Sequence, residues 1–380
     1  MPENRKSAIV LANRAFGTLE SKTANDLVIY GSGKYDISAV IDEEKAGKDA
    51  GLILGVGKRN IPVVRNLKEA LKLKPGALII GIAPPGGSLP EAWKDIVREA
   101  IKNRLDIVSG LHYFFGDQPE FVKLAEKHGV KLIDLRKPPK NMQVLMKLID
   151  IKVPVVAILS TDAATGKNIV MMELAKEAEK RGYKVGAVAT GQTMMLVRGD
   201  AGAALDAIPG DFISGTVAKM TADVAKMGKD LIIVEGQASL SHPAYAVETC
   251  AILYGSQPDA VIMVHDPFRG TRDGFPTMKV ASPKREIRLI ETINPKAKVV
   301  AISISYIYNY AGVKSDDEIR AAMRQAEKET NLPATDVQRF GAAKLFDAMA
   351  ERFAQVKKPL RKTCKRKSTE NICLQKGNTS

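Results

Sequence analysis

The feature of this sequence that most clearly carries chemistry is a loop containing glycine and lysine between an apolar run and a helical pattern. The apolar run covers residues 155–159, the loop STDAATGK covers 160–167, and the helical pattern follows at once. In a phosphate-binding loop, backbone N–H groups of the loop and helix start converge on an anion, and the lysine adds positive charge. The predicted phosphate site comprises Ser160, Thr161, Asp162, Thr165, Gly166, Lys167, Asn168 and, after the next strand, Gln192.

Two positions depart from the usual phosphate-loop pattern. Ser160 stands where the first glycine is expected, and Asn168 stands where a serine or threonine hydroxyl would hold Mg²⁺. The pattern therefore predicts phosphate binding more firmly than Mg²⁺-assisted hydrolysis. We predict no metal site, because the three cysteines have no metal-ligand spacing.

Three side chains near the ends of later strands are candidate bases. Glu235 and His265 each follow an apolar run directly, and His242 lies in the segment VEGQASLSHPAY, 234–245. A carboxylate or imidazole at such a position can remove a proton, although a carboxylate there more often only fixes its own turn. Because parallel strands bring their carboxyl ends to one edge, we expect these groups to converge near the phosphate loop.

Three arginines are candidate ligands for carboxylate or phosphate oxygens. A guanidinium grips two such oxygens at once, whereas an isolated loop arginine is more often solvated. The candidates are Arg198, Arg269 and Arg272.

Short apolar runs alternating with helical patterns position these residues. Such alternation predicts parallel strands with crossover helices, hence a Rossmann-like N-terminal sheet and a second, P-loop NTPase-like α/β domain. No GxGxxG follows the first run, so a dinucleotide fingerprint is absent. The expected strands are 7–12, 37–42, 77–83, 105–110 and 130–135, then 155–159, 184–189, 230–236, 260–266 and 298–305. The expected helices are 92–104, 118–129, 167–182, 319–330 and 341–356, with a short bridging helix over 142–149.

Composition and charge set the domain limits and the cellular setting. Hydrophobic residues make up 45% and charged residues 26%, which is typical of a globular protein. No stretch approaches the ~18 apolar residues of a membrane helix, and with no leader pattern a cytoplasmic protein is expected. Residues 357–380 carry a net +7 of the total +14. The predicted parts are a Rossmann-like domain (1–137), a linker (138–153), a P-loop domain (154–356) and a basic, disordered tail (357–380).

Eight segments in both domains carry a resemblance to a known family. They are LANRAFGTLESKTANDLVIYG (11–31), VIDEEKAGKDAG (40–51), IAPPGGSLPEAW (82–93), STDAATGK (160–167), TGQT (190–193), VEGQASLSHPAY (234–245), GSQPDAVIMVH (255–265) and LPATDVQRFG (332–341). In this order they resemble a family of P-loop proteins with a Rossmann-like N-terminal domain, associated with D-glutamate N-acetyltransferase activity. The resemblance covers residues 7–350.

The resemblance implies transfer of acetyl from acetyl-CoA to the amino group of an acidic D-amino acid. A P-loop can hold the phosphates of coenzyme A without phosphoryl transfer, which suits a loop lacking the Mg²⁺ hydroxyl. Gly166 and Lys167 would then contact the phosphates, and Thr161 and Asp162 would shape the loop. Glu235 and His265, with His242 third, are the candidate bases, and the three arginines would bind the substrate carboxylates.

Two other functions remain open from the sequence. The loop and the VEG turn also look like those of dethiobiotin synthetase, which favours an ATP- and Mg²⁺-dependent ligase or kinase. A non-catalytic nucleotide-binding protein is the third possibility, with the tail reaching a nucleic acid. We expect a small-molecule substrate, a homo-oligomer, no membrane partner, and no nucleic-acid contact other than through the tail. The acceptor and the ligand of the N-terminal domain stay open.

Overall fold

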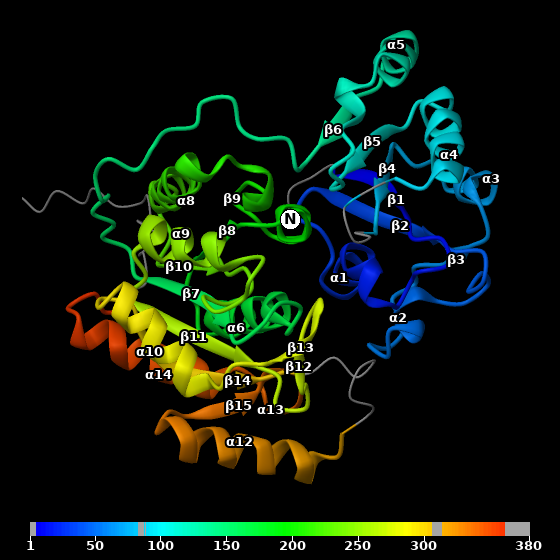
Figure 1. The fold of residues 1–380 in the computed structure, drawn as a ribbon. Coiled ribbons are helices and arrows are strands. Elements are labelled where there is room, and N and C mark those ends of the chain that lie inside the picture. The colour runs from blue at the N-terminus through cyan, green and yellow to red at the C-terminus, as the bar shows by residue number, and fades with distance from the viewer. Residues whose placement is uncertain (1–4, 83–86, 88, 306–313, 362–380) are drawn as a thin grey trace, which may run out of the picture.

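Two parallel β-sheets organise the chain (Figure 1). The computed structural model describes residues 5–82, 87, 89–305 and 314–361. The N-terminal sheet has the order β3-β2-β1-β4-β5-β6. Its strands are β1 (Lys6–Leu11), β2 (Tyr35–Ile41), β3 (Val63–Val64), β4 (Ala77–Ile80), β5 (Asp106–Ser109) and β6 (Leu132–Asp134). The helices of this half are η1 (Leu19–Ser21), α1 (Lys22–Tyr30), α2 (Ala50–Ile53), α3 (Leu67–Ala70), η2 (Leu71–Leu73), α4 (Glu91–Lys102), η4 (Phe115–Asp117) and α5 (Pro119–His128).

The second sheet has the order β15-β14-β11-β7-β10-β8-β9. Its strands are β7 (Val155–Ser160), β8 (Val185–Ala189), β9 (Ala201–Gly202), β10 (Leu231–Glu235), β11 (Ala260–His265), β14 (Lys298–Ile304) and β15 (Ala334–Asp336). A separate antiparallel hairpin consists of β12 (Thr271–Arg272) and β13 (Phe275–Lys279). The helices are α6 (Lys167–Lys180), α7 (Gln192–Val197), η5 (Leu205–Ala207), α8 (Gly210–Ala225), α9 (Ala246–Ser256), α10 (Pro283–Ile293), α12 (Asp316–Thr330), α13 (Val337–Phe340) and α14 (Ala343–Gln355).

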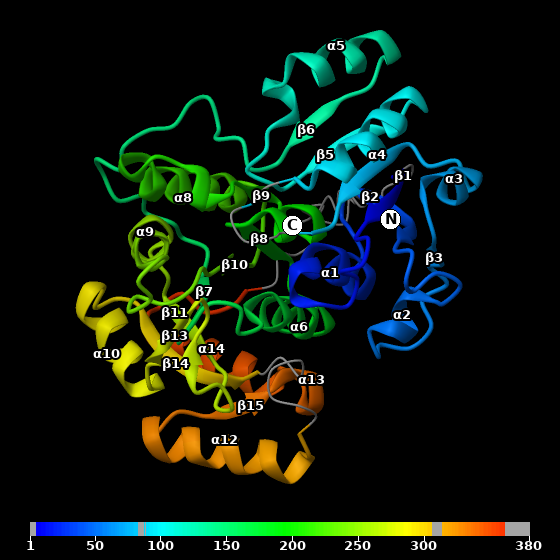
Figure 2. The same cartoon turned by 45° about the vertical axis from the view of Figure 1, so that its right-hand side comes forward.

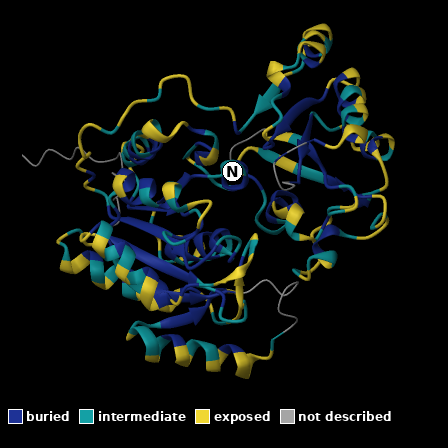
Figure 3. Cartoon of the chain, viewed as in Figure 1, coloured by how far each residue is buried: buried dark blue, intermediate teal, exposed yellow. Residues whose placement is uncertain are grey.

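Helices cover both faces of the second sheet, which explains its apolar strands. Every residue of β7, β8 and β10 is buried, because each strand packs against helices above and below (Figure 3). One core cluster contains Val156 and Ile158 of β7, and another contains Val155 and Ala157, as the two-residue period of a strand requires. None of the helices in the described ranges is long and apolar enough to cross a bilayer.

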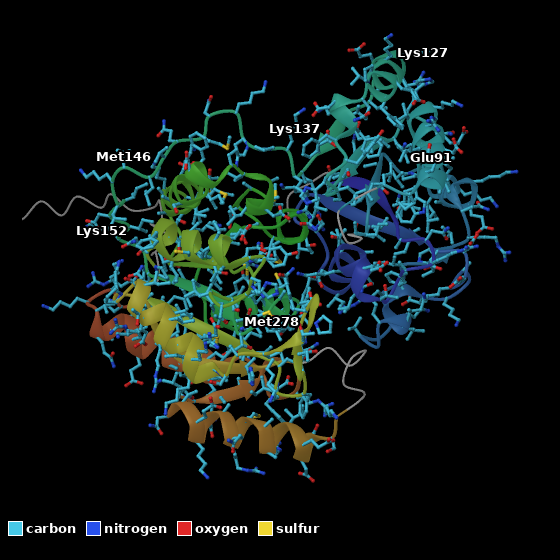
Figure 4. The ribbon with its side chains drawn as sticks, viewed as in Figure 1. Glu91, Lys127, Lys137, Met146, Lys152 and Met278 are labelled. Atoms are coloured by element: carbon cyan, nitrogen blue, oxygen red, sulfur yellow. The ribbon has the colours of Figure 1, made fainter. Side chains whose placement is uncertain are left out.

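The bridging helix expected over 142–149 is absent, so that prediction is wrong. The whole segment 138–153 is described and contains no helix or strand. It passes over α8, and Figure 4 labels Lys137, Met146 and Lys152 along this path. A Cβ on Gly215 of α8 would lie only 1.8 Å from the Gln143 carbonyl oxygen, so the segment lies directly on the helix backbone. The apolar side chains of Val144, Met146, Leu148 and Ile149 are exposed, so little apolar burial is available to stabilise a helix there. The expected domain limits stay a prediction.

The carboxyl edges of the two sheets face each other across a seam between the domains. α1, which follows β1, packs beside α7 and lies near α6 in both views (Figures 1 and 2). The Thr23 and Thr193 hydroxyl oxygens are 2.8 Å apart, and Gly33 N–H donates to the Val197 carbonyl. Gly110, directly after β5, lies so close to Gln192 that a Cβ would be 2.4 Å from the Gln192 Cγ. The carboxyl edges, at which parallel α/β sheets generally bind their ligands, therefore meet at one place.

Candidate functional site

The phosphate loop has the predicted position between β7 and α6, and it requires its glycine. Gly166 caps α6 with φ 93°, and a Cβ there would lie 2.3 Å from the Ser305 Oγ after β14. A larger side chain at this position would face both a strained backbone and a steric clash. The loop is further anchored to β11 because Thr161 N–H donates to the Val264 carbonyl over 3.0 Å.

Ser160, which replaces the first glycine, braces the loop from inside. Its hydroxyl lies 2.6 Å from the Asp162 carbonyl and 2.8 Å from the Ala238 carbonyl, and it accepts from Lys167 Nζ at 2.8 Å. Lys167 Nζ also donates to the Asp162 carbonyl over 3.2 Å. Burial, together with the nearby cation of Lys22, lowers the pKa of Lys167 to about 7. The lysine is therefore poised to take up a proton when an anion binds.

Asp162 is a buried acceptor at the centre of the loop. Its Oδ2 accepts from Arg269 Nη1 at 3.1 Å and from Asp273 N–H at 2.9 Å. Arg269 also donates to the carbonyls of Ala163 (2.7 Å) and Ala164 (2.9 Å). This arginine, predicted as a substrate ligand, thus holds the phosphate loop in shape.

Arg272 and His242 lie beside this aspartate. Arg272 Nη1 is 3.8 Å and His242 Nε2 3.6 Å from Asp162 Oδ1, which accepts no hydrogen bond from the described residues. Arg272 donates to the hydroxyls of Ser239 (3.3 Å) and Ser241 (2.5 Å). The β12–β13 hairpin carries Arg272, and Figure 4 labels Met278 on it. Both arginines are therefore committed to the protein around the loop.

The ring of His242 has a protein partner on each nitrogen. Ala244 N–H is 3.2 Å from Nδ1, and Nε2 lies 3.3 Å from the Asp273 carbonyl. The ring also stacks on Tyr245, with 5.1 Å between centroids. Burial lowers the pKa of His242, so the neutral ring with its proton on Nε2 satisfies both contacts. This arrangement suits a positioning residue better than a base.

Glu235 ends β10 and holds the turn after β8. Its Oε2 accepts from the N–H groups of Thr190 (2.7 Å) and Gly191 (2.9 Å). The Thr190 side chain also hydrogen-bonds to this carboxyl group, and the residue is only 4% exposed. Burial raises the pKa of this carboxyl group. Both backbone donors thus bind Oε2, and no backbone N–H of the described residues binds Oε1.

His265 lies at the end of β11, beside the loop on the opposite flank of β7. Its Nδ1 is 3.0 Å from Thr161 Oγ1, and burial lowers its pKa to about 4. The ring is consequently neutral at pH 7. Among the candidate bases, the structure therefore brings Glu235, His265 and His242 to the surroundings of one loop.

Arg198 and Gln192 lie apart from the loop itself. Arg198 forms an ion pair with Glu179, in the last turn of α6 and about 18 Å along the axis from Lys167. Gln192 faces Gly110 across the domain seam. The structure thus places Gln192 at the seam and leaves Arg198 outside the cluster.

The N-terminal domain contributes two residues that sequence reasoning did not assign. Asn168 Nδ2 donates to the buried Asp26 Oδ2 over 3.0 Å, and burial raises the pKa of this aspartate. Lys22, four residues earlier on α1, acts electrostatically on Asp26, Lys167 and Glu235. Both lie in segment 11–31, which carries the family resemblance, but nothing in its residue pattern pairs it with a loop 140 residues away.

Comparison with known proteins matches both domains. Residues 43–138 match the family described as "Domain of unknown function (DUF1611_N) Rossmann-like domain", and residues 142–346 match "Domain of unknown function (DUF1611_C) P-loop domain". The chain belongs to the DUF1611 family. The crystal structure of a DUF1611 family protein from Anabaena variabilis has a TM-score of 0.82 and 31% identity, covering 91% of this chain and 100% of that one. The predicted fold class and family are confirmed.

Two curated relatives of this DUF1611 protein carry the name of an enzyme. A protein from Tritonibacter scottomollicae is 34% identical over 289 residues, 75% of this chain and 84% of the relative. A protein from Pseudoalteromonas sp is 35% identical over 242 residues, 62% of this chain and 71% of the relative. Both are named D-glutamate N-acetyltransferase.

Proposed function

We propose that this DUF1611 protein transfers acetyl from acetyl-CoA to the amino group of D-glutamate or a similar acidic D-amino acid. The names of two relatives at about 35% identity support an enzyme of this kind. The observation that carries the rest is the bond between Asn168 and Asp26. Asn168 stands at the position of the usual Mg²⁺-binding hydroxyl, and its amide binds Asp26 instead. This bond favours a loop that holds phosphates without a metal ion. The cytoplasmic location and homo-oligomer expected from the sequence remain part of this proposal.

The phosphates of coenzyme A fit the charges around the loop. Lys167 carries the buried ammonium group, Lys22 adds a second cation from α1, and the first N–H groups of α6, like those of any helix, have no acceptor on a preceding turn. An anion here would raise the pKa of Lys167 and offset the repulsion between the two lysines. The loop would therefore hold its charge only when a ligand is bound.

Glu235 is the proposed base. The acceptor enters with its amino group protonated, and Glu235 Oε1 takes one proton from it. The free amine then attacks the thioester carbon, so that a C–N bond forms and the C–S bond breaks. The second proton on nitrogen goes to the departing thiolate, which leaves as the thiol. The raised pKa of Glu235 makes the carboxylate a better proton acceptor than a solvated glutamate.

The two histidines have supporting roles in this proposal. His265 stays neutral and, through Thr161, fixes the flank of the loop next to β11. His242 and Arg272 approach Asp162 Oδ1, and Arg269 binds Oδ2 together with the loop carbonyls. These contacts pre-form the loop, so that little ordering remains when the ligand binds.

Calorimetric titration separates this function from the ATP-dependent alternative. Acetyl-CoA without metal and ATP with Mg²⁺ would be titrated separately into wild type, Lys167→Met and the control Lys176→Met. Lys176 is on the same helix but is half-exposed and paired with Glu173. We expect acetyl-CoA binding in wild type and the control, and a loss of at least tenfold in Lys167→Met. Binding of only ATP with Mg²⁺ would overturn the proposal in favour of a ligase or kinase.

A further inference from the structure

A second polar cluster lies on the N-terminal side of the domain seam. Arg136, two residues after β6, forms an ion pair with Asp206 of η5 in the other domain. Its Nε donates to the Gly110 carbonyl over 2.7 Å. His112 Nε2 lies 3.8 Å from Asp206 Oδ2. Three segments that are distant in the sequence thus bring a cation, an anion and an imidazole together.

Hydrogen bonds connect this cluster to Glu235. Leu205, the neighbour of Asp206, donates its N–H to the Thr190 carbonyl over 3.0 Å. The N–H of Thr190 in turn donates to Glu235 at 2.7 Å. Two hydrogen bonds therefore link the segment that carries Asp206, through Thr190, to the carboxylate that we propose as base. The cluster lies where the carboxyl edges of the two sheets meet.

The cluster is sheltered but accessible. The side chain of Arg136 is 9% exposed, whereas those of Asp206 and His112 are 33% and 44% exposed. Arg136 Nη2 donates no hydrogen bond within the described residues, and it is not among the atoms sealed from solvent. A sheltered guanidinium with one free donor face binds a carboxylate strongly, because fewer waters compete.

We propose that Arg136 and Asp206 form the acceptor subsite, in which Arg136 binds the α-carboxylate and Asp206 the α-ammonium group of an amino acid. This inference rests on the proposed function and assigns the second substrate to the seam. An α-amino acid carries an ammonium group and a carboxylate group on the same carbon. The Arg136–Asp206 pair offers the complementary charges, a cation for the carboxylate and an anion for the ammonium group. The arginines expected from the sequence are engaged elsewhere: Arg198 with Glu179, Arg269 with the loop, and Arg272 with two serines.

The subsite also accounts for the position of His112. Its ring borders the pair, and its backbone N–H donates to the Gly87 carbonyl over 3.1 Å. A Cβ on Gly87 would lie 2.4 Å from the ring, so the glycine allows the ring to stay beside Asp206. Burial and the charge of Arg136 lower the pKa of His112, which keeps it neutral. Because the imidazole of His112 is neutral, it does not compete as a second cation with the acceptor's ammonium group for Asp206.

Steady-state kinetics test the subsite. The KM for D-glutamate at saturating acetyl-CoA, and the KM for acetyl-CoA at saturating D-glutamate, would be compared for wild type, Arg136→Met and Asp206→Asn. Arg98→Met on α4 is the control. Arg98 also forms an ion pair, but its partner is Glu120 on α5 of the same domain. We expect the KM for D-glutamate to rise about 10–100-fold in both subsite variants, with the KM for acetyl-CoA changed less than threefold. Equal changes in both KM values, or none, would overturn the subsite.

The exchanged pair Arg136→Asp with Asp206→Arg separates recognition from a simple domain clip. The double variant keeps opposite charges across the seam but reverses the side from which each charge comes. If the double variant has the circular dichroism spectrum and thermal midpoint of wild type while its KM for D-glutamate is still raised at least tenfold, the pair recognises the amino acid. Full recovery of the KM for D-glutamate would show that the pair only clips the domains together, and would overturn the proposal.

A separate measurement distinguishes this inference from the proposed function. If wild type releases no thiol with D-glutamate, the acetyltransferase proposal fails, and D-glutamate binding is then measured directly by calorimetry. Binding by wild type that is lost in Arg136→Met but kept in Arg98→Met would still support an amino-acid subsite. Binding that Arg136→Met leaves unchanged, or no binding by wild type, would overturn it.

Discussion

Asn168 Nδ2 donates to the buried Asp26 Oδ2 over 3.0 Å, joining the N-terminal domain to the first turn of the helix after the phosphate loop. In loops that bind Mg²⁺, the residue at this position supplies a hydroxyl to the metal ion. Here its amide supports a domain contact. The same residue that leaves the loop without a metal ligand thus holds α1 against the loop, and Lys22 of α1 acts electrostatically on Lys167.

Replacing Asn168 should destabilise the protein. In Asn168→Ser the shorter side chain cannot reach Asp26, and the buried carboxyl group loses its donor. We expect the free energy of unfolding to fall by about 1–3 kcal/mol. Urea denaturation at pH 7 measures this change. The control Asn103→Ser removes an exposed asparagine that bonds only within its own helix end, and it should change stability by less than ~0.5 kcal/mol. Equal effects of the two substitutions would show that the Asp26 contact contributes little.

Acetyl-CoA binding should take up a proton at alkaline pH. The pKa of Lys167 is lowered to about 7 in the free protein, so at pH 8 most of this lysine is neutral. A bound phosphate favours the charged form and raises the pKa, and the affinity therefore falls as pH rises above 7, by about tenfold between pH 6 and 8.

Calorimetry in two buffers of different ionisation enthalpy measures this proton directly. Wild type should take up close to one proton at pH 8, and Lys167→Met should take up none beyond that of the ligand itself. The titration of coenzyme A contributes equally to both variants. Identical proton uptake by the two would contradict a role for Lys167 in holding the phosphates.

Gly166→Ala should abolish ligand binding for two separable reasons. Its φ of 93° strains any other residue, and the new Cβ would lie 2.3 Å from the Ser305 Oγ. Gly228→Ala is the matched control, because Gly228 has φ 66° but open space around its Cβ position, and it should lose only about 1–2 kcal/mol of stability. In the double variant Gly166→Ala, Ser305→Gly the clash is relieved and part of the acetyl-CoA affinity should return. No recovery would mean that the backbone strain alone disrupts the loop.

Glu235→Gln should separate chemistry from binding. The amide keeps the size of the side chain, and its oxygen can still accept from Thr190 and Gly191, but it cannot take the acceptor's proton. We expect kcat to fall about 10²–10⁴-fold while the affinity for acetyl-CoA changes little. Stopped-flow thiol release and calorimetry measure the two quantities. A kcat within threefold of wild type would exclude Glu235 as the base.

The sequence predicts the sheets well because local patterns determine them. The apolar run before Ser160 and the helical period after Lys167 predict β7 and α6, and every expected strand is present among the described residues. The expected strand 77–83 ends earlier, at Ile80, and residue 83 lies outside the described residues, as do tail residues 362–380. The failed helix over 142–149 has an apolar pattern, but most of its apolar side chains are exposed, so no core packing stabilises a helix there.

The site was predictable only where its residues follow strands within one domain. The loop, Glu235 and His265 converge because parallel strands share a carboxyl edge. No such rule connects Lys22 or Asp26 to the loop, since that contact depends on how the two sheets pack against each other. Arg269 shows a different limit: its type suggests a ligand for oxygen atoms, and the oxygen atoms that it binds include the loop's own carbonyls.

The most direct test of the proposed function is product analysis with purified protein, acetyl-CoA and D-glutamate in the absence of ATP and Mg²⁺. Mass spectrometry would identify the product while a thiol reagent counts released coenzyme A. We predict one N-acetylated D-glutamate for each thiol in wild type, and loss of both signals in a folded Lys167→Met variant. Thiol release without N-acetylated product, or product that Lys167→Met forms at the wild-type rate, would contradict the account of a P-loop that holds coenzyme A for acetyl transfer.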